Sequence, residues 1–312
     1  MKPGRSAAVI DIGSNSIKVL VARRSPSGRP EEVFAETIEA RISAGISRKE
    51  PRLGAAGMAR GVAAIRELLA MAAPFSPERT LLVATSAVRD ARNGPVFRRR
   101  VREATGHAIR VLAGAEEAEL IGRGLACDPA LARLRNYYVF DLGGGSLECL
   151  AFCGRRARQS VSLQLGCVRL TERLVADPSR PMSLAEAREI ASHVGATMAA
   201  SGFKFNLPRG SVAVGSGGTL TTVRSIRAER EGVAFEGTNP EITLGEIHRL
   251  FEEIACKSLA ARKKIPGLPP ARADVFPAAL ATLISIASLG RFEGFRHSLY
   301  NLRWGLAASL IS

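Results

Sequence analysis

Two stretches of the sequence share one unusual pattern. Residues 11–18 are DIGSNSIK and residues 141–148 are DLGGGSLE, and each continues an apolar run. Both contain an aspartate, an apolar residue, a glycine, two small residues and a serine, with a charged side chain seven residues after the aspartate. Such a pattern predicts a strand that turns tightly into a second strand. Because it occurs twice, we expect two copies of one α/β lobe.

The segments around the two copies support a duplication. In the first half three strand-like runs are followed by a helix with apolar residues at helical spacing, and then by alternating strands and helices. The second half restarts with three strand-like runs at Tyr137. Ser183 with Glu186 and Thr243 with Glu246 have the spacing of capping boxes, which begin helices. The main expected strands are 7–12, 17–22, 33–40, 81–85, 137–142, 146–152, 158–165 and 211–216, and the main expected helices are 55–73, 96–104 and 115–126.

The charge of the chain indicates a polyanionic partner without naming it. Lys and Arg outnumber Asp and Glu by 44 to 29 in 312 residues, a formal charge of +15. Such a charge attracts polyanions through a long-range field that salt screens. Aromatic residues make up only 5%, and the basic runs at 98–100 and 155–158 contain none. This composition disfavours nucleic-acid binding and fits solvated basic faces.

The cysteines and apolar segments indicate a cytoplasmic protein. Five cysteines without a C-x-x-C pair are expected to be reduced and mostly buried. The N-terminal apolar run is too short for a signal peptide. The longest apolar segment, 275–289, is only about 15 residues and contains Pro277, so no membrane span is expected.

Glycine at such turns lets the backbone approach a ligand closely, because there is no Cβ in the way. Successive amide N–H groups can then converge on an anion. A third loop, VGSGGT at 214–219, has the same character. Any one of these loops is equally well explained as a tight turn, but three of them together favour phosphate binding.

Carboxylates near the second loop suggest a reaction at the phosphate. Asp141 and Glu148 flank the three glycines, and Mg²⁺ prefers carboxylate and water oxygens. On an uninterrupted strand, residues seven apart point to opposite faces, although the intervening turn can cancel this. Glu116 and Glu117 are also explained by the favourable charge at a helix start. Arg89 could bind phosphate or pair with a surface acid.

Other chemistries lack their motifs. There is no G-x-x-x-x-G-K-[ST] loop, no G-x-G-x-x-G after a strand, and the four histidines lack metal-ligand spacing. A histidine-based catalyst is therefore not expected.

The motifs together resemble the exopolyphosphatase and guanosine pentaphosphate phosphatase family, within the actin, Hsp70 and sugar-kinase superfamily. DIGSNSIKVLVA is similar to the first phosphate loop of the family, TSAVRDARN to its arginine motif, GAEEAELIGRG to its glutamate motif and DLGGGSLE to its second phosphate loop. LQLGCVRLTE, VGSGGTL, PGLPPARADVFPAAL and LRWGL follow in the family's order. The resemblance implies two duplicated actin-like (ribonuclease H-like) α/β lobes with an interlobe cleft, placed at 1–124 and 125–312.

The resemblance also implies roles for individual residues. Glu117 corresponds to the residue that positions or deprotonates the attacking water, and Arg89 to a phosphate-binding arginine of the catalytic set. Asp141 and Glu148 correspond to the residues tied to a divalent metal, Mg²⁺ or Mn²⁺, with a monovalent cation as a further candidate. The implied phosphate-binding residues are Gly13, Ser14, Asn15, Ser16, Gly143, Gly144, Gly145, Ser146, Ser216, Gly217 and Gly218.

The implied activity is Mg²⁺-dependent release of terminal orthophosphate from inorganic polyphosphate, with guanosine pentaphosphate as a second substrate and a homodimer as the expected assembly. Two features depart from the family pattern. Many relatives have arginine where this chain has Glu119, which places an extra acid beside the expected base. Longer relatives continue into a helical C-terminal region, so this chain is expected to be the short form. Its processivity and preferred substrate length therefore stay open.

Two other functions remain open. VGSGGT also resembles the nucleotide-binding turn of kinases in the superfamily, which would suit a phosphotransferase. A non-catalytic sensor of polyphosphate or guanosine tetraphosphate is the third hypothesis.

Overall fold

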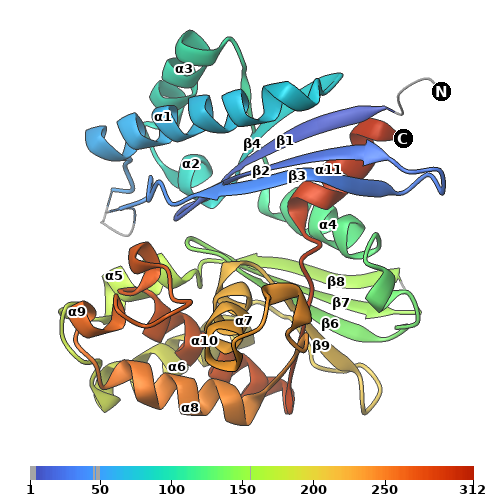
Figure 1. The fold of residues 1–312 in the computed structure, drawn as a ribbon. Coiled ribbons are helices and arrows are strands. Elements are labelled where there is room, and N and C mark those ends of the chain that lie inside the picture. The colour runs from blue at the N-terminus through green and yellow to red at the C-terminus, as the bar shows by residue number, and fades with distance from the viewer. Residues whose placement is uncertain (1–4, 45, 47–49, 155) are drawn as a thin grey trace. The chain divides into compact units, whose positions relative to one another are not determined.

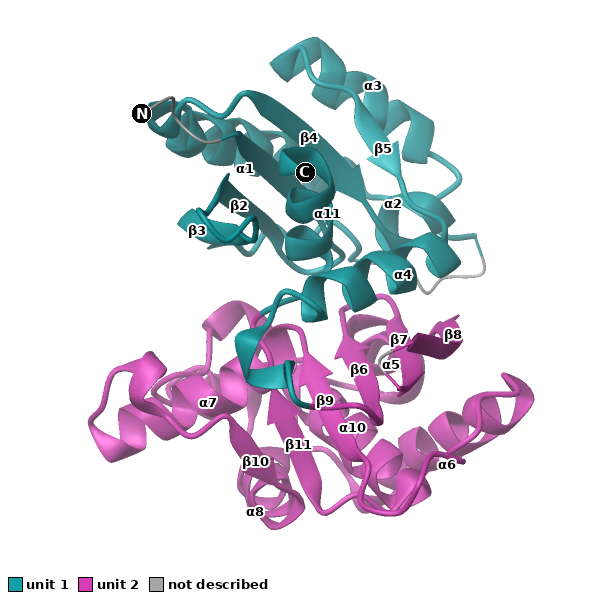
Figure 2. Ribbon diagram, turned by 90° about the vertical axis from the view of Figure 1, so that its right-hand side faces the viewer, with its two compact units in different colours: residues 1–133, 300–312 teal, residues 134–299 magenta. Residues whose placement is uncertain are grey.

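Two separate β-sheets, each with its own hydrophobic core, organise the chain in the computed structural model (Figure 1). The structure describes residues 5–44, 46, 50–154 and 156–312. The chain divides into unit 1, Met1–Arg133 with Tyr300–Ser312, and unit 2, Leu134–Leu299 (Figure 2). The first boundary falls after Arg133, where 124/125 was expected, and the last 13 residues return to the first unit.

Unit 1 is built on a five-stranded sheet with the order β3-β2-β1-β4-β5. The first three strands form antiparallel hairpins, and β4 and β5 join β1 in parallel. Most residues of β1 are buried whichever face they point to, as expected for a strand covered on both sides. The strands are β1 (Ser6–Ile12), β2 (Ile17–Arg24), β3 (Pro30–Ile38), β4 (Arg79–Ala84) and β5 (Ile109–Val111).

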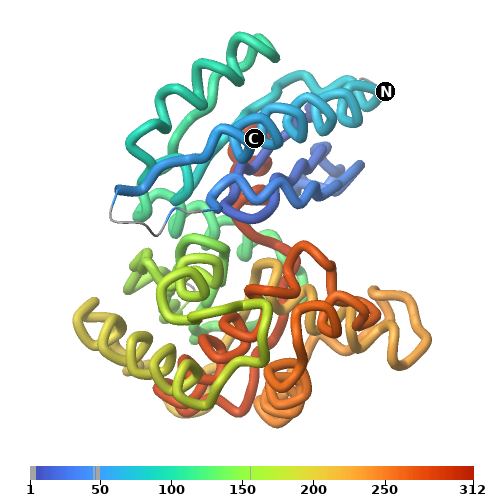
Figure 3. The backbone as a smooth tube through the Cα atoms, turned by 90° about the vertical axis from the view of Figure 1, so that its left-hand side faces the viewer, coloured from blue at the N-terminus to red at the C-terminus, as the bar shows by residue number. Residues whose placement is uncertain are grey.

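Helices cover both faces of this sheet. Two long helices, α1 and α3, pack side by side on one face (Figure 3). Gly61 of α1 lies against the Phe97 ring of α3. On the other face α11 crosses β1 and β2 and packs along α4. The helices of unit 1 are α1 (Ala55–Ala72), α2 (Ser86–Asp90), α3 (Gly94–Thr105), α4 (Gly114–Leu125) and α11 (Leu302–Ile311).

Unit 2 repeats the same sheet and adds one strand. Its order is β10-β11-β9-β6-β7-β8, so β8-β7-β6-β9-β11 corresponds to β3-β2-β1-β4-β5 in both order and direction. This correspondence confirms the predicted duplication. The strands are β6 (Tyr137–Leu142), β7 (Leu147–Cys153), β8 (Arg156–Leu163), β9 (Val212–Ser216), β10 (Glu241–Thr243) and β11 (Gly294–His297).

The longest apolar segment of the sequence is the central helix of unit 2. Pro277 does not interrupt α10 but lies in its first turn, where a missing N–H costs nothing. Across the described residues, every helix is too short or too polar to cross a bilayer. The helices are α5 (Cys167–Leu174), α6 (Leu184–Ala200), α7 (Gly218–Glu231), α8 (Leu244–Ala255), α9 (Leu259–Arg262) and α10 (Phe276–Gly290).

The two capping boxes have different outcomes. Ser183 and Glu186 form the complete reciprocal pair at the start of α6. Thr243 accepts the Glu246 amide at the start of α8, but the Glu246 carboxylate pairs with Arg227 instead of returning to the cap. A nearby arginine therefore competes successfully with the local bond.

All five cysteines are free, as expected, but fewer of them are buried than the sequence predicted. Cys149 and Cys167 are buried, whereas Cys256 is exposed. Burial, reinforced by the adjacent Glu148 charge, raises the pKa of the Cys149 thiol well above its usual range. Cys149 is therefore an inert thiol.

The basic runs of the sequence are exposed, as expected. Arg98, Arg99 and Arg100 are exposed, and so are Arg156 and Arg158, while Arg155 lies outside the described residues.

Two glycines allow α11 to lie directly against α4. A Cβ on Gly305 would lie 2.0 Å from the Leu120 carbonyl oxygen, and one on Gly124 would lie 1.9 Å from that of Asn301. Neither contact tolerates a side chain, so these glycines are required by helix packing.

We expect Gly305→Ala to destabilise the protein by about 1–3 kcal/mol, because the added methyl group forces the two helices apart. The matched control is Gly195→Ala in α6, where a Cβ meets nothing within 4 Å. That change should stabilise by roughly 0.5–1 kcal/mol through helix propensity. Thermal unfolding of both variants tests the packing, and equal melting temperatures would contradict it.

Candidate functional site

The first loop, between β1 and β2, is a tight turn whose backbone carbonyls accept hydrogen bonds from residues 41–43. The Gly13 amide donates to the Ser16 carbonyl at 3.1 Å, which uses the Gly13 N–H within the turn. Ser43 donates both its amide and its hydroxyl to the Ser14 carbonyl, at 3.2 and 3.0 Å, and the Arg41 amide donates to the Asn15 carbonyl at 2.7 Å. In a trans peptide the next N–H points the opposite way. The amides of Asn15 and Ser16 are thus directed away from residues 41–43.

The second loop, between β6 and β7, repeats this arrangement in unit 2. The Gly143 amide donates to the Ser146 carbonyl at 3.0 Å, as Gly13 does in unit 1. The Gly143 carbonyl accepts from the Cys167 amide at 3.0 Å, and the Gly144 carbonyl accepts from Val168 at 2.9 Å. The start of α5 therefore holds the carbonyls of the glycine loop.

Arg169 completes this clamp from within α5. Its Nε donates to the Gly145 carbonyl at 3.0 Å, and the side chain is buried. By peptide geometry, the N–H groups of Gly144, Gly145 and Ser146 then face away from α5. Within the described part of the chain, the amides of Gly144 and Gly145 donate to no backbone carbonyl outside the regular helices and strands. Consecutive outward N–H groups of this kind form an anion-binding nest.

The close approach of α5 depends on Gly166. A Cβ at this position would lie 2.3 Å from the backbone nitrogen of Gly145 and 2.4 Å from the carbonyl carbon of Gly144. The loop with its three glycines can therefore pack against this segment only because residue 166 is also a glycine.

The third turn, between β9 and α7, lies against the second loop. Gly217 has φ 90°, and a Cβ there would be 2.5 Å from Asp141 Oδ1. A Cβ on Gly218 would be 2.3 Å from a guanidinium nitrogen of Arg272. An aspartate and a buried arginine are therefore packed onto the N-terminal turn of a 14-residue helix, an end that favours anions.

Two hydroxyl groups at this turn are buried without a protein partner. Ser216 is 1% exposed and Thr219 0%, and neither Ser216 Oγ nor Thr219 Oγ1 has a hydrogen bond to any described residue. Buried polar atoms are normally satisfied, so these two atoms indicate a group that the protein itself does not supply.

The predicted metal residues share one face of the sheet. Asp141 and Glu148 are direct cross-strand partners in the β6–β7 register, and such partners point to the same side. The four-residue turn thus cancels the strand alternation. Ser216 lies beside Asp141 in β9, and Ser162 lies beside Glu148 in β8. Ser162 Oγ donates to Glu148 Oε1 at 2.8 Å and orients this buried carboxylate.

This donor set fits Mg²⁺ bound together with a substrate. Magnesium sites commonly use one or two carboxylates, with water and phosphate oxygens completing the shell. Among the described residues there is no group of three or more His, Cys, Asp or Glu side chains placed to hold a metal. Asp141 and Glu148 would therefore supply part of a shell, not a complete protein cage.

In unit 1, Arg89 and Glu117 are brought together. Arg89 NH1 donates to Glu117 Oε2 at 2.9 Å and to the Leu112 carbonyl at 2.9 Å, and its Nε lies 3.5 Å from Asp90. Glu117 is 5% exposed in the first turn of α4. Both Glu117 and its neighbour Glu116 pair with an arginine, but the Glu117 side chain is only 7% exposed, against 34% for Glu116.

Glu119 does not join this pair. It forms an ion pair with Arg123 at 2.7 Å on an exposed side of α4, with 64% of its side chain exposed. The additional acid is therefore paired with Arg123 on the exposed side of α4.

A sequence model of the Ppx/GppA phosphatase family matches residues 20–312. The chain belongs to this family. Membership of the Ppx/GppA family makes it an exopolyphosphatase-like phosphoric anhydride hydrolase, as the motifs indicated.

Solved structures show the same fold. An exopolyphosphatase from Cytophaga hutchinsonii is 22% identical over 98% of each chain, with a TM-score of 0.86. A Ppx/GppA family member from Aquifex aeolicus is 24% identical over 98% of this chain and 97% of its own, with a TM-score of 0.76. An exopolyphosphatase-like protein is 23% identical over 99% and 98%, with a TM-score of 0.87. These similarities establish a mixed α/β fold of two actin-like lobes.

Sequence reasoning assigned no role to Arg169, Arg272 or Ser162. The first two lie in stretches quoted for their family resemblance, LQLGCVRLTE and PGLPPARAD. A lone arginine in a helix has no signal of burial, so only their exposures of 5% and 7% reveal them.

Arg169→Met should lower the rate of phosphate release about ten- to a hundredfold, because a misplacement of about 1 Å in the loop has effects of this size. The matched control is Arg173→Met on the exposed side of α5, which should leave the rate unchanged. The loss should fall mainly on kcat if the nest stabilises the transition state. A variant that only melts earlier and keeps both kcat and KM would contradict the role.

Proposed function

We propose that this protein is a Mg²⁺-dependent exopolyphosphatase that releases terminal orthophosphate from inorganic polyphosphate. The observation that carries the proposal is the second loop, where α5 and Arg169 hold the carbonyls of Gly143, Gly144 and Gly145. The outward amides can then bind a phosphoryl group at no cost of rearrangement, and such preorganised donors are effective where negative charge develops.

In the mechanism, Glu117 positions the attacking water and accepts its proton. Arg89 holds one Glu117 oxygen, which leaves the carboxylate fixed in direction. The amides of Gly144, Gly145 and Ser146 bind oxygens of the terminal phosphoryl group. Mg²⁺, or Mn²⁺ in its place, would be held by Asp141 and Glu148 and would neutralise charge on the phosphate.

The surface charge supports a polymeric substrate. The formal charge is +15, and α3 exposes Arg98, Arg99 and Arg100 in succession. A field of this sign raises the local concentration of a polyanion and speeds its encounter, in a way that salt weakens. Guanosine pentaphosphate, a smaller anion with the same phosphoanhydride, is proposed as a second substrate. The homodimer stays a prediction.

The test is orthophosphate release from medium-length polyphosphate, with Mg²⁺ and after its removal by chelation. Wild type should release phosphate only with the metal. Glu117→Gln should lose about a hundredfold or more, the scale of a positioned acid or base. Glu67→Gln, on the exposed side of α1, serves as the control and should keep full activity. Replacing polyphosphate with guanosine pentaphosphate in the same assay tests the second substrate.

Two results would overturn the hydrolase. Formation of ATP from ADP and polyphosphate, without phosphate release when ADP is absent, would indicate a phosphotransferase. Tight polyphosphate binding without turnover under any divalent metal would indicate a sensor.

A further inference from the structure

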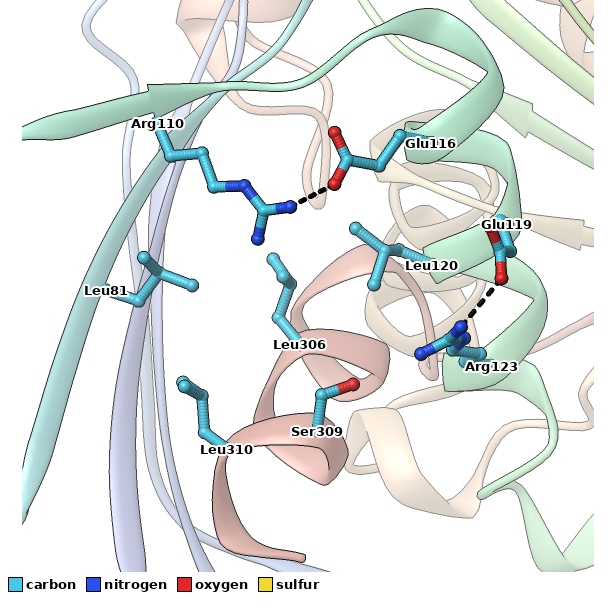
Figure 4. Close-up of a pocket in the computed structure, with 9 residues that line it drawn as sticks. All are labelled: Leu81, Arg110, Glu116, Glu119, Leu120, Arg123, Leu306, Ser309 and Leu310. Carbon is cyan, nitrogen blue, oxygen red and sulfur yellow. Dashed lines mark hydrogen bonds and ion pairs between the residues drawn. The ribbon is translucent and has the colours of Figure 1, made fainter.

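A cavity in unit 1 lies on the side of α4 that carries Glu116 rather than Glu117. It measures about 280 Å³, is lined by residues of β4, β5, α4 and α11, and is partly open to solvent (Figure 4). Every residue that lines it belongs to unit 1. Its volume is just below the range of about 300–1,000 Å³ that holds drug-sized ligands, so it suits a smaller molecule.

The floor of the cavity is apolar. Leu81 from β4, Leu120 from α4, and Leu306 and Leu310 from α11 line it, and Figure 4 shows their side chains directed at a common space. Leu81 and Leu310 are only half-buried. A ligand that covers them would remove apolar surface from water, which is favourable.

The rim carries two Arg–Glu ion pairs. Arg110 of β5 donates to Glu116, and Arg123 donates to Glu119 at 2.7 Å, with both glutamates on α4. The side chains are between 34% and 64% exposed, and exposed pairs of this kind contribute only about 0–1 kcal/mol. Each pair uses one guanidinium nitrogen, whereas a guanidinium has five N–H donors. The rim can therefore admit the charges of a ligand at small cost.

We propose that this cavity binds an apolar α-amino acid as a zwitterion. The carboxylate would take arginine donors, the ammonium group would pair with a glutamate, and the side chain would cover the leucines. The rim has two positive and two negative groups, so a simple anion would face two carboxylates and a simple cation two guanidiniums. Only a ligand with both charges and an apolar body complements all three features.

Binding is coupled to Glu117 through the first turn of α4. Glu116 and Glu117 are neighbours about 100° apart around the helix. Glu116 is held by Arg110 at the cavity, and Glu117 is held by Arg89 at 2.9 Å. A ligand carboxylate that binds the remaining donors of Arg110 competes with Glu116 for this guanidinium and weakens one of these two attachments. The turn that carries Glu117 is then held less firmly, so the amino acid lowers kcat.

The binding test is calorimetric titration of the full chain without polyphosphate. L-Leucine and L-phenylalanine are the probes. Three control compounds each lack one feature: L-alanine lacks the large apolar side chain, N-acetyl-L-leucine lacks the ammonium group, and L-leucinamide lacks the carboxylate. Leucine or phenylalanine should bind at least about tenfold more tightly than all three, a difference of about 1.4 kcal/mol. Equal binding of N-acetyl-leucine, or no binding of either probe, would overturn the proposal.

The location is tested with Ser309→Phe, which places a ring in the cavity from an exposed position on α11. Ser288→Phe on α10 is the matched control, because both serines are exposed and bond to the carbonyl four residues earlier. Ser309→Phe should abolish leucine binding while Ser288→Phe keeps it. Binding that survives in both variants would place the ligand elsewhere.

The coupling is tested on phosphate release, and this part alone rests on the proposed function. Leucine should lower kcat of the wild type about fivefold or more, the scale of typical allosteric coupling, and should have no effect on Ser309→Phe. Binding without any change in kcat would overturn the coupling. Because binding is measured without substrate, failure of the hydrolase and failure of the amino-acid site are separate results.

Discussion

The candidate phosphate site depends on the direction in which a few peptide groups are turned. At each hairpin loop a later segment takes the carbonyl oxygens, residues 41–43 in unit 1 and the start of α5 in unit 2. Because a peptide is planar, fixing the oxygen on one side fixes the following N–H on the other. In the proposed site, anion recognition would thus come from backbone geometry, and the side chains around the loops would hold that geometry in place.

The duplication explains why the two units are similar in geometry and different in chemistry. Asp11 faces Lys18 in the first hairpin as Asp141 faces Glu148 in the second. The same register places a lysine in one unit where the other has a glutamate. Under the proposed function, the lysine beside the first loop would suit a phosphate contact and the carboxylate pair beside the second a metal-assisted contact. One backbone design would then support two proposed roles.

The sequence predicted the hairpins and the duplication, because turn chemistry and apolar periodicity are local properties. It also indicated Arg89 and Glu117 separately, whereas their contact depends on how α2 and α4 pack. Arg169 and Gly166 could not be found in this way, since their importance comes from the approach of α5 to a loop more than 20 residues earlier in the chain, as in the Arg169 to Gly145 bond. Thr243 shows the converse case: it caps α8 as its local motif predicts, but the Glu246 carboxylate that would complete the box binds Arg227, which lies on another helix.

The return of α11 to unit 1 bears on how the protein is made. Unit 1 consists of Met1–Arg133 and Tyr300–Ser312, with all of unit 2 between them. Its sheet is covered on one face by a helix that leaves the ribosome only after unit 2 has been synthesised. Contacts so distant in sequence carry a high entropic cost of closure and form late. The first unit to be synthesised is thus the last to be completed, and until then the apolar faces of β1 and β2 need protection from aggregation.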